Sequence, residues 1–206
     1  NLTSNDPNTQ QWHSFNFCTG QCWYDNFVYT PPGHPDVLYA GGSYLYGENV
    51  ANHRGVLRST NAGETFNDVT FDGTDPVHPN GIHPDQHRLV THPRNPAQFF
   101  EASDGGVMRS SGQYVNRSAN CNSRGLEEPF LTRCRELLSR IPSRLDSMNR
   151  NLPTLQFQSL SVSPFDNDEL QGGTQDNGTW ENYGSENVWV NTMIGDGGQS
   201  GFDATD

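Results

Sequence analysis

The chain contains no lysine, so all 12 of its basic residues are arginines, and 24 aspartates and glutamates outnumber them. The net charge of -12 at pH 7 would repel the phosphates of nucleic acids and of anionic lipids, so no nucleic acid partner is expected. No apolar run is long enough for a membrane-spanning helix, and no membrane insertion is expected. Without a signal peptide or an initial methionine, we expect a processed or excised piece of a longer protein.

Apolar residues are also scarce, because only 32% of the chain is hydrophobic, which is low for a domain with one deep core. In contrast, 21 glycines, 13 prolines and an aromatic content of 11% are typical of many short strands joined by turns. Disorder would also explain low hydrophobicity, but frequent and evenly spread aromatic residues argue against it. The composition therefore predicts an all-β protein.

Cysteines are few but fall close together along the chain. They form two local pairs, Cys18 with Cys22 and Cys121 with Cys134. Local pairs are typical of disulfides formed in an oxidising compartment, whereas a zinc site would need a second matching pair near the first. Glycosylation sequons begin at Asn1, Asn116 and Asn177 and are compatible with export. The sequence predicts two disulfides and an extracellular, secreted location.

A strand, a proline-containing turn and a second strand recur along the chain, centred on Leu38, Phe99 and Leu170. A shared Gly-Val-x-Arg-Ser string follows in the first two copies. The pattern predicts blade-like repeats near residues 23–70, 88–115 and 157–192, with the start of another at 199–206.

The stretch 116–151 breaks this β pattern. Between Pro129 and Arg140, apolar residues recur every three or four positions, which predicts one short helix of about three turns. A bond between Cys121 and Cys134 would tie this helix to the preceding loop. We therefore expect a helical loop insertion, clipped by a disulfide.

The string from Ser59 to Phe66 resembles the Asp-box, or bacterial neuraminidase repeat, whose pattern is roughly Ser-x-Asp-x-Gly-x-Thr-Trp. Asn61 stands in place of the aspartate and Phe66 in place of the tryptophan. Both substitutions are conservative, because asparagine can also hydrogen-bond the backbone of its own turn and phenylalanine can also pack between strands. Further strings strengthen the resemblance: Trp23-Tyr-Asp-Asn26, His83-Pro-Asp-Gln-His87, Ser103-Asp-Gly-Gly106, Gly172-Gly-Thr-Gln-Asp-Asn-Gly178 and Gly195-Asp-Gly-Gly198.

Together these strings are similar to the sialidase-like and sortilin-like β-propeller group, relatives of the xyloglucan-cleaving glycoside hydrolases. The resemblance implies a β-propeller segment of about three four-stranded blades with one helical insertion. It also implies a secreted protein that acts on or binds glycans. Because a propeller typically needs at least four blades, the remainder of the ring is expected on the same or another chain.

Two imidazoles and a carboxylate alternate at His83, Asp85 and His87. In an extended segment the three side chains would point to one side and could converge on a metal ion or a substrate. The alternative is a turn whose polar side chains bond loop backbone groups.

Four loop carboxylates end separate repeats: Asp25, Asp104, Asp176 and Asp196. Loops at one mouth of a propeller could bring such residues together as the acid and base of a glycosidase, and Asp176 and Asp196 are the leading candidates. The same oxygens could hold a divalent cation such as Ca²⁺, although no cofactor is certain. Each of these sequences is also an ordinary turn.

Aromatic side chains near these loops could stack against sugar rings. Those considered are Trp23, Tyr24, Trp180 and Trp189, with Trp23 and Trp180 as the binding candidates beside Asp25 and Asp104. The alternative is that they wedge between blades. The two functional hypotheses are therefore a glycoside-hydrolase-like protein and a non-catalytic extracellular propeller that binds a protein or polysaccharide or builds an assembly.

Overall fold

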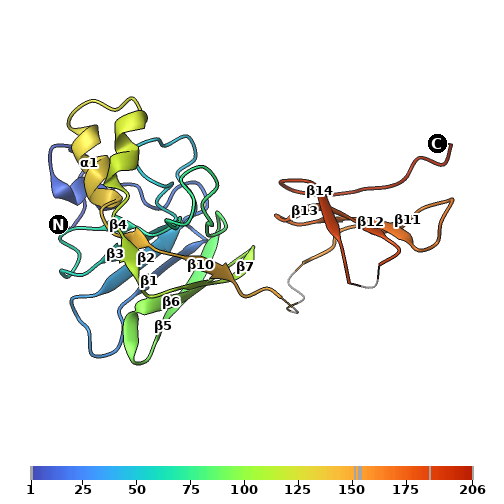
Figure 1. Cartoon of the computed structure of the whole chain (residues 1–206), viewed down its shortest axis with the longest axis horizontal. Coiled ribbons are helices and arrows are strands. Elements are labelled where there is room, and N and C mark those ends of the chain that lie inside the picture. Colours follow the sequence, from blue (N-terminus) through green and yellow to red (C-terminus); the bar gives the residue numbers. More distant parts are fainter. Residues whose placement is uncertain (1, 151, 153–154, 186, 206) are drawn as a thin grey trace. The chain divides into compact units, whose positions relative to one another are not determined.

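A computed structural model describes residues 2–150, 152, 155–185 and 187–205. The chain divides into two compact units, Asn1–Arg150 and Asn151–Asp206 (Figure 1). The described residues form mainly short antiparallel strands with little helix, which confirms the prediction of an all-β protein. No helix among them is long and apolar enough to cross a membrane.

The first sheet belongs to the first unit and has the simple strand order β1-β2-β3-β4. Its strands are β1 (Asn26–Tyr29), β2 (Leu38–Gly42), β3 (Val56–Ser59) and β4 (Asn67–Asp68). Glycine is needed at position 41 in β2 because the Phe27 ring of β1 lies against it, and a Cβ there would be 2.2 Å from a ring carbon. Short strands with small residues thus allow an aromatic ring to cover the sheet.

The sequence Ser59–Phe66, which resembles an Asp-box, forms the turn between β3 and β4. The Ser59 hydroxyl accepts hydrogen bonds from the backbone amides of Asn61 (3.2 Å) and Gly63 (2.9 Å). The Asn61 side-chain oxygen accepts one from the Thr65 amide at 3.0 Å. Phe66 is buried in a core cluster. Asn61 thus hydrogen-bonds the backbone of its own turn, and Phe66 packs in the core. These are the roles that the Asp-box pattern gives to the two positions.

The second sheet also lies in the first unit, and its strand order is β10-β7-β6-β5. Its strands are β5 (Gln86–His92), β6 (Asn95–Ser103), β7 (Gly106–Ser110) and β10 (Leu145–Ser147). The outer strand β10 lies within residues 116–151, which were expected to form only a helical insertion. The chain therefore leaves the sheet after β7 and returns to pair with it, so the sequence repeat at 88–115 holds only three of the four strands.

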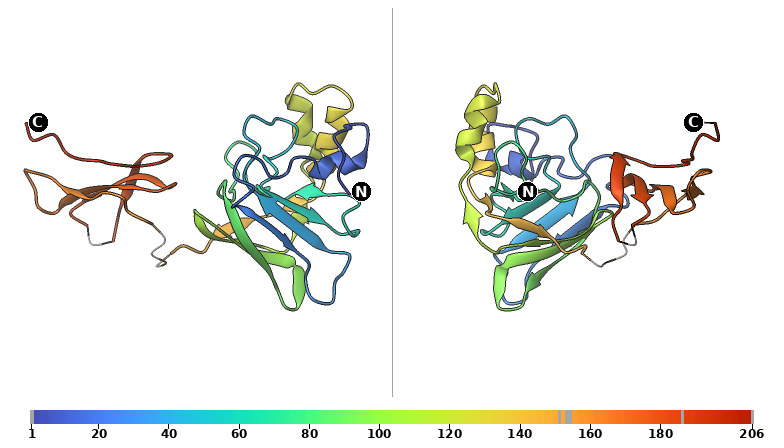
Figure 2. Two further views of the ribbon diagram at one scale, coloured as in Figure 1. Left: turned by 180° about the vertical axis from the view of Figure 1, so that it is seen from behind. Right: turned by 45° about the vertical axis from the view of Figure 1, so that its right-hand side comes forward.

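A shared apolar layer joins the first two sheets, which lie against each other in the views of Figure 2. The Tyr39 ring of β2 meets the Phe99 ring of β6 edge to face, with centroids 5.6 Å apart. Both side chains are fully buried, and Leu89 and Leu145 join them from β5 and β10. Burial of these large side chains is the main apolar contribution to the stability of the pair of sheets.

The predicted insertion contains the 3₁₀ helix η2 (Ser118–Ser123) and the helix α1 (Phe130–Leu137), which is about two turns long. A two-stranded sheet, β8 (Tyr114–Val115) with β9 (Ile141–Pro142), closes its base. Helix α1 packs on the N-terminal 3₁₀ helix η1 (Gln10–Ser14) through an edge-on contact of Phe130 with Trp12. Both predicted disulfides are present, Cys18–Cys22 and Cys121–Cys134.

The second unit contains a third four-stranded sheet, with the order β11-β12-β13-β14. Its strands are β11 (Ser161–Val162), β12 (Glu169–Thr174), β13 (Gly178–Tyr183) and β14 (Val190–Met193). Residues 199–205 form no strand, so the expected start of another repeat is not seen there. That the three four-stranded sheets are propeller blades stays a prediction.

The third sheet carries many exposed apolar side chains. Those on or beside its strands include Leu160, Val162, Phe165, Tyr183 and Met193. Among the described residues, the buried apolar side chains all belong to the first unit. A single sheet with no buried apolar layer needs a second layer for independent stability.

Glu101 of β6 is an unusual member of the core because its side chain is fully buried. Neither of its carboxylate oxygens has a hydrogen-bond partner among the described residues. Burial raises the pKa of this carboxyl well above its ordinary value of 4.5. The protonated acid is therefore the form that folding favours, and its ionisation opposes folding.

We expect Glu101→Gln to stabilise the chain at neutral and alkaline pH. A carboxyl with a raised folded-state pKa contributes stability below pH 4.5 that is lost as the pH rises through the folded-state value. Thermal unfolding at several pH values should show little difference from the wild type near pH 4 and an advantage of a few degrees at pH 8. The exposed Glu64→Gln is the matched control, and an equal shift at both pH values in Glu101→Gln would contradict the assignment.

Candidate functional site

The candidate site of the first unit gathers around His87, and we call it the His87 cluster. Its members come from the loop before β1, from the start of β5 with the segment before it, and from the turn after β6: Gln21, Trp23, Tyr24, Asp25, His83, Asp85, His87 and Asp104. The Cys18–Cys22 disulfide clips the loop that carries the first four of these residues. Asp25 immediately precedes β1 and Asp85 immediately precedes β5, so both occupy the same place in their sheets.

The imidazole of His87 lies between two carboxylates. Its Nε2 is 2.5 Å from Asp104 Oδ1, and its Nδ1 is 3.6 Å from Asp25 Oδ1. Because a carboxylate only accepts hydrogen bonds, Nε2 carries a hydrogen when Asp104 is ionised. Asp25 is almost fully buried, whereas about a third of the His87 side chain remains exposed. The sequence predicted Asp25 and Asp104 as loop carboxylates, and the fold brings them to one histidine.

Asp85 and His83 form a second arm of the cluster. Gln21 donates a hydrogen bond from Nε2 to Asp85 Oδ1 at 2.9 Å, and Asp85 Oδ2 is 3.7 Å from His83 Nδ1. Burial raises the pKa of Asp85 above its ordinary 3.8, although the neighbouring His83 offsets part of the rise and the Asp104 charge adds to it. Sequence reasoning missed Gln21, whose only signal is its place between two bonded cysteines.

His83, Asp85 and His87 all belong to the cluster, but they do not follow one another along a single extended segment. The chain bends at Pro84 and Asp85, and the pairing of β5 with β6 shifts register between Gln86 and Arg88, so the expected alternation of side chains is lost. Among the residues described, no three His, Cys, Asp or Glu side chains are placed to hold a metal ion. A divalent cation such as Ca²⁺ stays a prediction without a defined set of ligands.

Two aromatic side chains cover the cluster on its solvent side. Trp23 is 83% exposed and Tyr24 is 60% exposed. The Tyr24 ring stands edge-on to His87 with centroids 5.4 Å apart, and Trp23 lies 5.7 Å from Tyr24. Exposed aromatic rings beside buried carboxylates are typical of a binding surface and have no role in the core.

The second unit brings together the other predicted carboxylates. The backbone amide of Asp176 donates to Asp196 Oδ1 at 3.0 Å, and Asp176 has a positive φ of 61° in the turn between β12 and β13. Trp180 donates from its indole nitrogen to the Asn177 carbonyl at 2.7 Å, and its side chain is half-buried. This contact of Asp196 is that of a side chain that bonds the backbone of a turn. The catalytic prediction for Asp176 and Asp196 is not tested by these contacts.

Comparisons with known proteins add no relative. No protein-family model matches the chain, and a search of curated proteins finds no match. The assignment of function therefore depends on the geometry of the chain and on the resemblance of its motifs.

Opposite changes in the pKa of Asp85 would test the electrostatics of the His87 cluster. Asp104→Asn removes a negative charge that raises the Asp85 pKa and should lower it. His83→Gln removes a group that lowers this pKa and should raise it. The Asp85 carboxyl-carbon signal, followed by NMR over a pH titration, reports both shifts. Movement in the same direction in both variants would show that the cluster is arranged differently.

Proposed function

We propose that the chain is part of a secreted Asp-box β-propeller that binds glycans, with the His87 cluster as the sugar site. The observation that carries the proposal is the exposed pair Trp23 and Tyr24 next to the Asp25–His87–Asp104 chain of polar groups. The flat apolar faces of aromatic rings match the C–H faces of pyranose rings, while carboxylates and imidazoles bond sugar hydroxyl groups. A site of this composition suits a glycan better than an anionic ligand.

The propeller part of the proposal is supported by the repeated four-stranded sheets and by the Asp-box turn. Three sheets with antiparallel strands are the form that blades take. The exposed apolar side chains of the third sheet also suit a blade that another blade covers. The expected partners are a glycan or an extracellular protein, together with the remainder of the propeller on the same or another chain. The two disulfides accord with an extracellular location.

Removal of the aromatic pair should weaken glycan binding. We expect Trp23→Ala with Tyr24→Ala to reduce affinity by about tenfold or more, because each stacked ring contributes about 1 kcal/mol. A glycan array followed by calorimetry on the best oligosaccharide would measure the change. Tyr183→Ala, at an exposed tyrosine of the second unit, is the control. Unchanged binding in the double variant would remove the His87 cluster as the sugar site.

Glycoside hydrolysis is the second candidate function, and the raised pKa of Asp85 favours it. Asp85 would protonate the glycosidic oxygen as the C–O bond breaks, and Asp104 would take a proton from the water that attacks the anomeric carbon. Asp176 and Asp196 remain the alternative acid and base.

Paired substitutions decide between these assignments. If hydrolysis of an array glycan is detected, Asp85→Asn and Asp104→Asn should each lower kcat by about a hundredfold or more, whereas the exposed Asp36→Asn should leave it unchanged. A loss confined to Asp176→Asn and Asp196→Asn would move the chemistry to the second unit. Binding without hydrolysis by any form of the chain would leave the non-catalytic propeller as the function.

A further inference from the structure

A cavity separate from the His87 cluster lies in the first unit, on the side that the insertion covers. Its volume is about 400 Å³, which is within the range of small-molecule sites. Its walls come from the loop before β3, from the segment 71–79 and from the insertion. No member of the His87 cluster lines it, so the two sites are separate.

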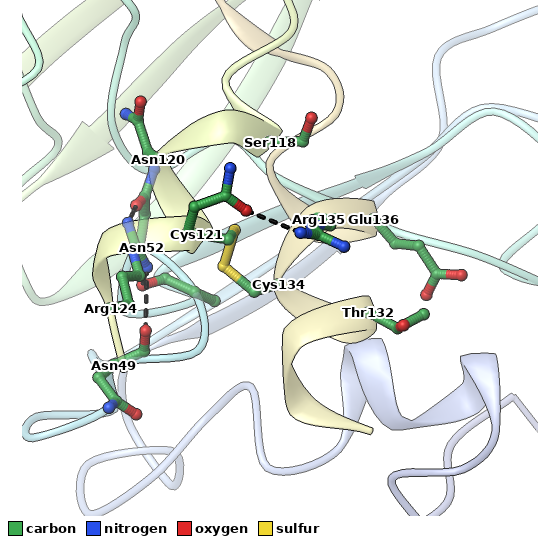
Figure 3. Close-up of a disulfide and its surroundings, with 12 residues drawn as sticks. Asn49, Asn52, Ser118, Asn120, Cys121, Arg124, Thr132, Cys134, Arg135 and Glu136 are labelled. Atoms are coloured by element: carbon green, nitrogen blue, oxygen red, sulfur yellow. Dashed lines mark hydrogen bonds between the residues drawn. A yellow bond between two sulfur atoms is a disulfide. The ribbon is translucent and has the colours of Figure 1, made fainter. Parts of the chain in front are cut away.

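The insertion wall of this cavity is fixed by a disulfide and an arginine. Cys121–Cys134 joins η2 to α1, and Arg124 lies just after η2 (Figure 3). The Arg124 guanidinium donates to the carbonyl oxygens of Asn49 (3.2 Å) and Ala51 (2.7 Å) and to Asn52 Oδ1 (2.9 Å). These bonds hold the insertion against the loop before β3, so the cavity has walls that do not depend on a ligand.

Backbone strain is stored in the opposite wall. His53 lines the cavity, and both His53 and the adjacent Arg54 have positive φ values, 67° and 50°. The buried Asp68 holds this turn by accepting bonds from the amides of Asn52 (2.7 Å) and Arg54 (2.9 Å) through one oxygen. The His53 ring stacks on Tyr44 with centroids 5.1 Å apart. Two successive strained residues without glycine are typical of a ligand site.

The charged side chains around this cavity already have hydrogen-bond partners. Arg124 has its three oxygen partners, and Arg117 donates to the Gly73 carbonyl. Asp72 accepts from several backbone amides and polar side chains, among them Leu145 N at 2.8 Å and Asn80 N at 3.0 Å. The lining thus holds two arginines, Arg117 and Arg124, and two aspartates, Asp72 and Asp75, so neither sign of ligand charge is favoured and a neutral ligand fits better.

Glu48 places a buried carboxyl in the wall of the cavity. Its side chain is only 5% exposed, and Oε1 is paired with Arg54. Its Oε2 is buried and has no hydrogen-bond partner among the described residues. Burial, which outweighs the attraction of Arg54, raises the pKa of Glu48 to about 7, so this carboxyl is only partly ionised near neutral pH.

Apolar and amide groups complete the lining. Phe71, Pro79 and Ile141 supply apolar surface, while Asn52 and Asn120 supply amides that both donate and accept. This mixture matches a compact molecule that has hydroxyl groups at its edge and C–H groups on its faces. A monosaccharide unit has both.

We propose that this cavity binds a neutral sugar unit, as a second glycan site built by the insertion. The site extends the proposed glycan function but does not need the His87 cluster. The insertion then has a role of its own, because it supplies one wall of a binding site.

NMR titration of the isotope-labelled chain with D-glucose, D-galactose, D-xylose and D-glucuronate would test the proposal. We expect at least one neutral sugar to shift the amide signals of Asn52, His53 and Asn120 with millimolar affinity. Val77 lies at the cavity mouth and is 72% exposed, so Val77→Trp should block entry without a change in the core. It should weaken binding at least tenfold, whereas the same change at the exposed Val188 of the second unit should not.

Three results would overturn the proposal: no shift of these amides with any neutral sugar, shifts with glucuronate alone, or unchanged affinity in Val77→Trp. If that variant does not fold, Asn120→Leu takes its place, because it removes one polar lining group at a half-buried surface position. Loss of sugar binding at this cavity can be distinguished from loss of glycan binding at the His87 cluster. Trp23→Ala with Tyr24→Ala should leave the cavity shifts unchanged, and Val77→Trp should leave binding at the His87 cluster unchanged.

Discussion

The contact between Tyr39 and Phe99 is the interaction on which the first unit depends. In a chain with few apolar residues, this contact lies in the buried apolar cluster that joins the two four-stranded sheets. Because the sheets are held face to face, the loops at their strand ends meet. Sheet packing therefore brings Asp25 to His87, whereas the pairing of β5 with β6 within one sheet places Asp104 beside it.

Features that depend on residues close together in the sequence could be predicted from it. Features that depend on pairing between distant strands could not. The Asn61 turn and both disulfides depend on neighbouring residues, so their spacing predicted them. Strand β10 pairs with β7 only after the chain has passed through the insertion, and no local pattern records that return. The register shift at His87 likewise interrupts the regular alternation of side chains that the sequence suggested.

Buried ionisable groups distinguish the described sites from the surrounding acidic surface. Asp85 belongs to the His87 cluster and Glu48 lines the separate cavity, and burial raises the pKa of both. An acidic surface of short turns explains the many exposed carboxylates, but it does not explain carboxyl groups held away from water beside histidines and arginines. Sequence alone could propose which carboxylates belong to loops, whereas only the fold shows which of them are buried.

The imidazole of His87 offers the most direct measurement of the central claim, that the His87 cluster binds a glycan. Its ring nitrogen signals can be followed by NMR while an oligosaccharide identified on a glycan array is added. The account predicts saturable shifts of the His87 signals and none at the exposed His34, which lies outside the cluster. Saturable binding that leaves the His87 signals unmoved would contradict it.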